Sequence, residues 1–307
     1  MDGDGAFGAV GAVSGIKNPI CLSRAVLEHS QKPDPLGRIP PLVLVSEGAR
    51  SFALRHSIPS VSPESLICAR AKNSWVRWKE KYETGVPITD TDEGFELQDT
   101  VGSVAMCGHS LAAGVSRLAN TFPSSSPFFF GIQIPSDSGG ILLKFPGRMG
   151  EAGIFGAGCW AQRSAQRSVA CSVSGAGEYI TRASLARALG SAIVCSSEED
   201  DPHDIIHRLL RDEFWDPSRK LGEPHPNVGV LVLTKEEEAG RTIGLNQAPG
   251  FPGTVRLWCA FTTSSMALAF ASTDNPKPKA FVLRQGAFTS DTDDCNPPIF
   301  ITAYTLS

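Results

Sequence analysis

A threonine at the start of a predicted hairpin is the residue best placed for nucleophilic chemistry. A polar, acid-rich run over residues 89–96 precedes Asp99, and from Thr100 the chain is largely apolar as far as Met106. A turn near residue 108 and a second apolar run over 111–116 predict a β-hairpin that begins at Thr100. The polar run before it predicts an exposed and flexible leader.

Thr100 gains a second reactive group if the bond between Asp99 and Thr100 is cut. A threonine at a new N-terminus carries a nucleophilic hydroxyl and a free α-amine that can act as its base. The unperturbed pKa of an α-amine is about 7.7–8.0, which suits it to accept the hydroxyl proton near neutral pH. The sequence therefore predicts self-cleavage at Asp99–Thr100, followed by amide hydrolysis. Taken alone, a threonine at a strand start is more often only a β-former.

Further glycine-rich motifs follow this hairpin in a fixed order. They are Ser-Gly-Gly at 138–140, Gly-Arg-Met-Gly at 147–150, Gly-Ala-Gly-Cys-Trp-Ala at 156–161 and Val-Ser-Gly-Ala-Gly-Glu at 173–178. With the Thr100 hairpin they resemble, in order, the β-subunit of the type 2 asparaginase family, which are N-terminal-nucleophile hydrolases. Within that family, residues 37–41, 47–49 and 159–160 are similar to the threonine aspartase branch. The resemblance runs from Gly8 to the late strands.

The resemblance implies a fold and an assembly. Residues 1–99 would be a partial α-subunit with a flexible cleavable linker over about 69–99, and residues 100–307 would be the β-subunit. The expected architecture is the four-layer αββα sandwich, incomplete at the N-terminus because the family's first strand and helices precede Met1; periodicity alone indicates α+β. The subunits would form an αβ heterodimer that pairs into a dimer of heterodimers. A chain shortened in this way is expected to fold or self-cleave poorly.

The resemblance also implies roles for particular residues. Thr100 is the expected nucleophile, and Ser138, with the backbone amide of Gly175, would stabilise the oxyanion. Ser174 and Gly177 are expected to lie against the substrate. A surface or turn role is the commoner explanation for each serine taken alone.

Two charged residues bear on the substrate. Arg148 is the expected holder of a substrate carboxylate, since its planar fork can bind one bidentately. Asparaginases and isoaspartyl peptidases have an acid near the position of Glu151 that pairs with the free amine of a small substrate, and threonine aspartases lack it. We expect an endopeptidase that cuts after aspartate. The alternatives are an isoaspartyl peptidase/L-asparaginase or an inactive truncated homologue.

An irregular stretch, residues 117–137, interrupts the family pattern. It is rich in Ser, Pro and Phe and has no helical or strand period. When it is removed on paper, the flanking residues reproduce the family's Val-Ser-Ser-Gly-Gly run. Two explanations stay open, an unspliced intron in the gene model and a genuine surface loop.

Composition excludes some classes of function. The net charge is −4 and basic residues do not cluster in long blocks, so a nucleic-acid surface is not expected. The longest apolar run is too short to cross a membrane. The eight cysteines have no CxxC spacing, which favours reduced, buried thiols in an intracellular protein, cytoplasmic or nuclear. We expect no cofactor and no metal. His203 and His207 lie one helical turn apart, but no third ligand is in register.

Periodicity predicts the remaining elements. Helices are expected over about 19–30, 47–56, 69–83 and 184–194, with another that Asp201 caps and Pro202 begins. Strands are expected over 6–13, 42–45, 228–233, 255–262, 266–271 and 280–283. The helix over 69–83 carries Trp75 and Trp78 among basic residues, which indicates either a solvated amphipathic helix or a patch for a partner.

Overall fold

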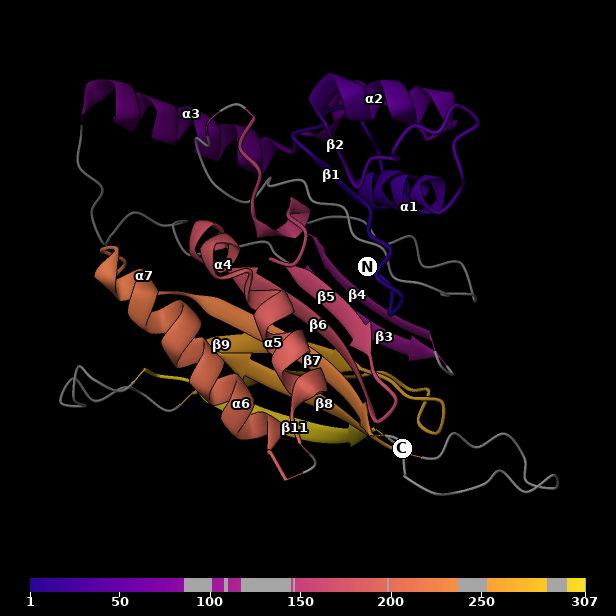
Figure 1. The fold of residues 1–307 in the computed structure, drawn as a ribbon. Coiled ribbons are helices and arrows are strands. Elements are labelled where there is room, and N and C mark those ends of the chain that lie inside the picture. The colour runs from indigo at the N-terminus through magenta and orange to yellow at the C-terminus, as the bar shows by residue number, and fades with distance from the viewer. Residues whose placement is uncertain are drawn as a thin grey trace.

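The computed structural model describes residues 1–85, 101–107, 110–116, 145, 147–197, 199–236, 253–285 and 297–306. Its central element is an antiparallel sheet with the strand order β11-β8-β7-β6-β5 (Figure 1). The strands are β5 (Cys159–Arg163), β6 (Arg167–Gly175), β7 (Val228–Glu236), β8 (Thr254–Phe261) and β11 (Phe300–Leu306). Successive side chains of a strand point to opposite faces. On β7, Val228, Val230 and Val232 therefore enter one apolar core, while Leu231 and Leu233 enter another.

Helices cover the first of these faces (Figure 1). They are α4 (Gly177–Ala183), α5 (Leu185–Cys195), α6 (Pro202–Leu209), a π-helical segment (Leu210–Trp215) and α7 (Asp216–Lys220). Helix α5 lies close to the sheet because Gly190 has no side chain; a Cβ atom there would stand 2.4 Å from Cδ1 of Trp160. The Asp201 carboxylate accepts a hydrogen bond from the backbone N–H of His203 at 2.9 Å, so the predicted cap of α6 is confirmed.

Two hairpins cover the opposite face of the sheet. Strand β3 (Val101–Cys107) pairs with β4 (Ser110–Ser116), and β9 (Ser265–Phe270) pairs with β10 (Lys279–Arg284). Apolar side chains of both hairpins share a core with Leu233, Leu257 and Cys259 of the sheet. The N-terminal residues extend the first hairpin, since Asp2 forms an antiparallel bridge with Ala112 on β4.

A smaller unit with its own core lies beside the first hairpin (Figure 1). It comprises β1 (Ala9–Gly11), α1 (Pro19–Ser30), the parallel strand β2 (Val43–Val45) and α2 (Ser46–Arg55), followed by a 3-10 turn (Pro63–Leu66) and α3 (Ala69–Thr84). Val10, Leu22 and Phe52 are among its buried residues. Gly8 permits the close approach of α1, because a Cβ atom there would stand 2.4 Å from the Ser23 carbonyl oxygen.

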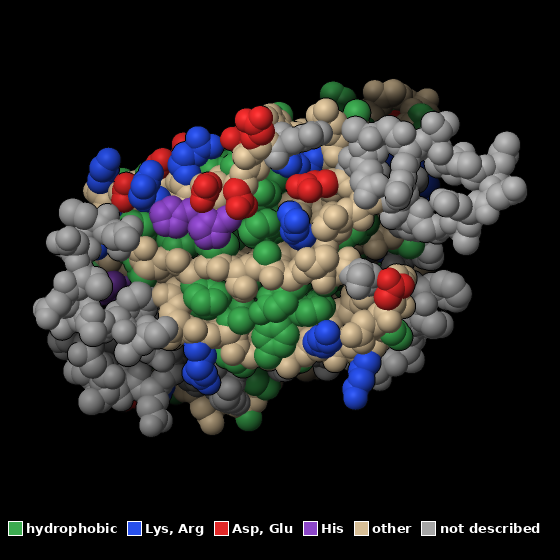
Figure 2. All heavy atoms as spheres, turned by 90° about the horizontal axis from the view of Figure 1, so that it is seen from below, with side chains coloured by type: hydrophobic (Ala, Val, Ile, Leu, Met, Phe, Trp, Pro, Cys, Tyr) green, Lys and Arg blue, Asp and Glu red, His purple; other side chains and the backbone are tan. Residues whose placement is uncertain are grey.

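The surface mixes charges of both signs. Seen from below, one margin of the molecule carries acidic, basic and histidine side chains together, so no single sign of charge dominates that face (Figure 2).

On α3, Trp78 is buried, whereas Trp75 is half exposed beneath the Lys79 ammonium at 4.9 Å. No helix in the described part of the chain is both long and apolar enough to cross a membrane.

The predicted buried thiols are only partly observed. All seven described cysteines are free. Cys159, Cys171 and Cys259 are buried, and burial raises the pKa of each thiol, that of Cys259 to about 12. The prediction is wrong for Cys21, Cys68, Cys107 and Cys195, which are exposed. Their positions at element ends or on the outer faces of helices account for this difference.

Most predicted elements are confirmed, with small shifts at their ends. The first hairpin, the helices of both layers and the four late strands are present. The strand predicted over 6–13 is shorter, because only Ala9–Gly11 pairs with β2. The α+β class is confirmed, and the four-layer arrangement stays a prediction. Strands β5, β6 and β11 were not predicted.

Candidate active site

The hairpin β3–β4 lies directly on β6. The Ser172 hydroxyl donates a hydrogen bond to the carbonyl oxygen of Gly114 at 2.6 Å. Gly102 lies over the same serine, since a Cβ atom there would stand 2.4 Å from Ser172 Oγ. Because Gly102 has no side chain, β3 can approach β6 closely at this point.

The direction of β4 relative to β6 determines which end of β6 lies near the start of β3. Val115 of β4 lies beside Gly158, whose Cβ position would be 2.6 Å from Val115 Cγ1. The Gly158 carbonyl in turn accepts the backbone N–H of Val173 on β6 at 2.8 Å. Strand β4 therefore runs in the same direction as β6. Val101 pairs with Ser116 at the end of β4, so β3 begins toward the C-terminal end of β6.

An ion pair with two hydrogen bonds stands just beyond that end of β6. Arg148 Nε donates to Glu178 Oε1, and Arg148 Nη2 donates to Glu178 Oε2, each at 2.6 Å. Glu178 is the second residue of α4, and Arg148 precedes a short 3-10 turn (Glu151–Gly153). The Arg148 side chain is 13% exposed and that of Glu178 is 57% exposed. The pair therefore joins the loop to the start of α4, with the acid on the solvent side.

A buried carboxylate lies next to this pair. Glu151 begins the 3-10 turn and is fully buried. A Cβ atom on Gly177 would stand 2.3 Å from Glu151 Oε2 and 3.4 Å from Arg148 Nη2. One acidic and one basic group thus flank the first residue of α4, and they come this close because residue 177 is glycine.

Neighbouring strands hold the loop that carries these two groups. A Cβ atom on Gly11 of β1 would stand 2.7 Å from the sulfur of Met149. A Cβ atom on Gly158 would stand 2.9 Å from the Glu151 carbonyl oxygen. The loop is therefore fixed between β1 and the start of β5.

A tight turn connects β6 to the site. Ser174 lies two residues after Ser172, so both side chains project from β6 toward the hairpin layer. Gly175 has φ +145°, and a Cβ atom there would stand 2.0 Å from the carbonyl oxygen of Asn227. That carbonyl accepts the Ala176 N–H at 2.8 Å. Only glycine fits residue 175, and the turn delivers the next residues directly to α4.

The structure brings together part of the site predicted from the sequence. Arg148, Glu151 and Gly177 are in contact or adjacent, and Ser174 and Gly175 lead into them. The other predicted residues, Asp99, Thr100 and Ser138, lie outside the described residues, as does the whole 117–137 stretch.

Glu178 was not among the predicted site residues. It is the last residue of the 173–178 motif, and it follows Gly177 in the sequence. An acid in the first turn of a helix has a common explanation in the helix dipole. No signal in the sequence linked it to Arg148, thirty residues earlier.

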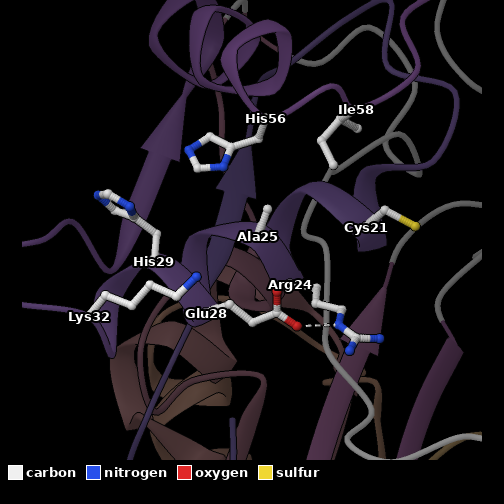
Figure 3. Close-up of a pocket in the computed structure, with 8 residues that line it drawn as sticks. All are labelled: Cys21, Arg24, Ala25, Glu28, His29, Lys32, His56 and Ile58. Carbon is white, nitrogen blue, oxygen red and sulfur yellow. Dashed lines mark hydrogen bonds and ion pairs between the residues drawn. The ribbon is translucent and has the colours of Figure 1, made fainter.

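A surface pocket of about 300 Å³ lies elsewhere, along α1 and after α2 (Figure 3). Arg24, His29, Lys32 and His56 line it, and Arg24 pairs with Glu28 at 2.6 Å. Partial burial, and then the neighbouring charges of His29, Arg55 and Lys32, lower the pKa of His56. His29, Lys32 and His56 lie near the C-terminal ends of α1 and α2, where the helix dipole favours positive charge. None of the predicted site residues lines this pocket.

The described part of the chain contains no ready set of metal ligands. His203 pairs with the neighbouring Asp204 at 3.0 Å. No three His, Cys, Asp or Glu side chains among the described residues are grouped to hold a metal ion.

Comparison with known families gives a match over more than half of the chain. A family model described as asparaginase matches residues 1–118 and 135–200. The unmatched interval, 119–134, lies inside the stretch 117–137 that interrupts the motif pattern. All the described site residues fall within the second matched range.

Similar proteins carry related names. The chain is 31% identical over 194 residues to an isoaspartyl peptidase of Escherichia coli, covering 60% of this chain and 48% of that protein. It is 33% identical over 189 residues to the human isoaspartyl peptidase/L-asparaginase, covering 61% and 49%. A plant-type L-asparaginase of Pyrococcus horikoshii is 31% identical over 189 residues, covering 59% and 49%. The chain thus spans about half the length of the relatives it matches.

Proposed function

The chain belongs to the asparaginase family, and from this premise we propose that it is a threonine-type amide hydrolase for β-aspartyl peptides and asparagine. The observation that carries the proposal is the placement of one basic and one acidic side chain beside the start of α4. Arg148 Nη2 and Oε2 of the buried Glu151 both lie beside Gly177, within 3.4 Å of the place where its Cβ atom would stand. The names of the similar proteins favour the same substrates.

The charges suit a small zwitterion. A β-aspartyl dipeptide and asparagine each carry a free α-carboxylate and a free α-ammonium on the residue that is attacked. The Arg148 fork would bind the carboxylate and Glu151 the ammonium. Binding both groups would fix the side-chain amide of the substrate relative to the protein, which lowers the entropic cost of reaction.

Thr100 would supply the chemistry after self-cleavage. Its free α-amine would accept the hydroxyl proton while the oxygen attacks the amide carbon. Ser138 and the Gly175 amide would donate hydrogen bonds to the oxyanion. The intermediate would expel ammonia or an amine, leaving an aspartyl ester on Thr100. Water would then hydrolyse that ester and release aspartate.

The threonine aspartase hypothesis is the second candidate, and the residues 37–41 and 159–160 favour it. Glu151 weighs against it. An aspartate inside a polypeptide has no free α-amine, so a carboxylate buried at this place would face the substrate chain without a cationic partner from it. Assembly as an αβ heterodimer and a dimer of heterodimers belongs to the proposal under either hypothesis.

The test compares two substrate classes. The whole chain, and its Thr100→Ala and Thr100→Ser variants, would be incubated with β-aspartyl-leucine and with an internally aspartate-containing peptide. We expect hydrolysis of the dipeptide, loss of activity in Thr100→Ala and residual activity in Thr100→Ser, whose hydroxyl remains. Cleavage of the longer peptide alone would support the aspartase. A rate on both substrates that Thr100→Ala leaves unchanged would refute the proposed nucleophile.

A further inference from the structure

The ion pair between Arg148 and Glu178 has a geometry that bears on substrate binding. The Glu178 carboxylate takes one edge of the guanidinium, the edge formed by Nε and Nη2, with both hydrogen bonds at 2.6 Å. Two bonds in one plane leave the guanidinium little freedom to rotate. The position of Glu178 on α4 therefore sets the plane of the Arg148 side chain.

The two partners are unequally exposed, which argues against a purely stabilising role. Glu178 is 57% exposed while Arg148 is 13% exposed. An ion pair with one partner largely in water adds little to the stability of a protein. Exposure of Glu178 to water does not weaken its effect on the orientation of Arg148 in the same way, because the orientation depends on the hydrogen-bond geometry.

A guanidinium can serve two carboxylates at once. It carries five N–H donors in a rigid plane, so its side-on edge and its end-on edge can each bind a carboxylate bidentately. Glu178 uses the side-on edge. Nη2 belongs to both edges, and it lies 3.4 Å from the place where a side chain of Gly177 would begin.

We propose that Glu178 is a positioning residue that holds Arg148 in the plane needed to receive the α-carboxylate of the substrate. The inference rests on the proposed function and adds a specificity-determining residue to it. Two consecutive residues of α4, Gly177 and Glu178, would then both act on the Arg148 guanidinium. Because Gly177 has no side chain, the Glu151 carboxylate and the guanidinium can both lie beside it, and Glu178 sets the plane of the guanidinium.

The test measures binding to the whole chain by titration calorimetry with two probes, L-aspartate and its α-amide, which lacks the α-carboxylate. In Glu178→Ala we expect the affinity for L-aspartate to fall roughly tenfold or more, the range expected for losing charge-assisted hydrogen bonds. Affinity for the α-amide should change far less. Glu178→Gln, which keeps one acceptor for the arginine, should lie between Glu178→Ala and the unchanged chain.

A matched control is Glu28→Ala, which removes a glutamate from the exposed Arg24 pair on α1 and should leave both affinities unchanged. Equal affinities of Glu178→Ala and the unchanged chain for L-aspartate would overturn the inference. Tighter binding by Glu178→Ala would also overturn it, since Glu178 would then be a competitor of the substrate. An unchanged chain that binds neither probe would instead refute the substrate class of the proposed function, and the inference with it.

Discussion

The Glu151 carboxylate lies against Gly177, where a Cβ atom would stand 2.3 Å from Oε2. A glutamate can therefore extend this far from residue 151 only because residue 177 has no side chain. The Glu151 side chain is one methylene longer than an aspartate would be, and residue 177 leaves no space beyond that needed for this longer arm. This pair of residues fixes how far an acidic group reaches toward the end of β6.

Gly177→Ala should damage the site. The methyl group would overlap the Glu151 carboxylate, so we expect a loss of about 1–3 kcal/mol in the free energy of unfolding and loss of aspartate binding. Gly48→Ala is the matched control, since Gly48 lies in α2 with no atom within 4 Å of its Cβ position. That control should gain roughly 0.5–1 kcal/mol. Chemical denaturation measures both, and equal stabilities would contradict the contact.

Glu151→Gln should discriminate between the two candidate functions. It keeps the shape of the side chain but removes the charge that would bind the substrate amine. Under the proposed function, kcat/KM for β-aspartyl dipeptides should fall by roughly tenfold or more. Under the aspartase hypothesis that rate is already low and should hardly change. Glu151→Asp, which keeps the negative charge on a shorter side chain, should retain more activity than Glu151→Gln.

Arg148→Lys should impair substrate binding although the charge is kept. A lysine cannot bind a carboxylate bidentately and cannot satisfy Glu178 through two parallel bonds. We expect KM for β-aspartyl dipeptides to rise by roughly 10- to 100-fold. Arg211→Lys is the control, because Arg211 pairs with Asp212 on the surface of the helical layer. Steady-state kinetics on both variants tests this, and equal KM values would contradict the role of Arg148.

His56 should make the protein less stable in mild acid. Its pKa is lowered in the folded state by partial burial and by His29, Arg55 and Lys32 around it. The unfolded chain therefore binds the proton more readily, and stability is lost as the pH falls below about 6.5, the unperturbed value. Melting temperatures at pH 7.5 and 5.5 should differ less in His56→Gln than in the unchanged chain. His225→Gln, on an exposed loop, serves as the control.

Helices and strands that carry a clear local pattern in the sequence were predicted correctly. Asp201-Pro202 marked the start of α6, and the alternating or apolar runs marked the hairpin and the late strands. Strand β6 was missed because it is buried on both faces, so its small and polar residues carry no alternation. Strand β5 was missed because it has only five residues and begins inside the glycine-rich motif at 156–161.

The candidate site was only partly predictable, for a physical reason. Arg148, Glu151 and Gly177 were identified by their motifs, but their contact depends on how the 3-10 turn Glu151–Gly153 packs against β1 and α4. The Glu178 ion pair arises from the same packing, between residues thirty positions apart, which no local pattern encodes. Glycines at 102, 158 and 177 make these contacts possible, and their necessity is visible only in three dimensions.

The central claim is that Thr100 becomes a new N-terminus, and N-terminal sequencing of the purified protein tests it most directly. We predict two fragments, of about one third and two thirds of the chain, the larger beginning Thr-Val-Gly-Ser-Val. Thr100→Ala should remain whole. A single 32.6 kDa chain with only the original N-terminus, obtained both from the sequence as it stands and after deletion of residues 117–137, would contradict the account.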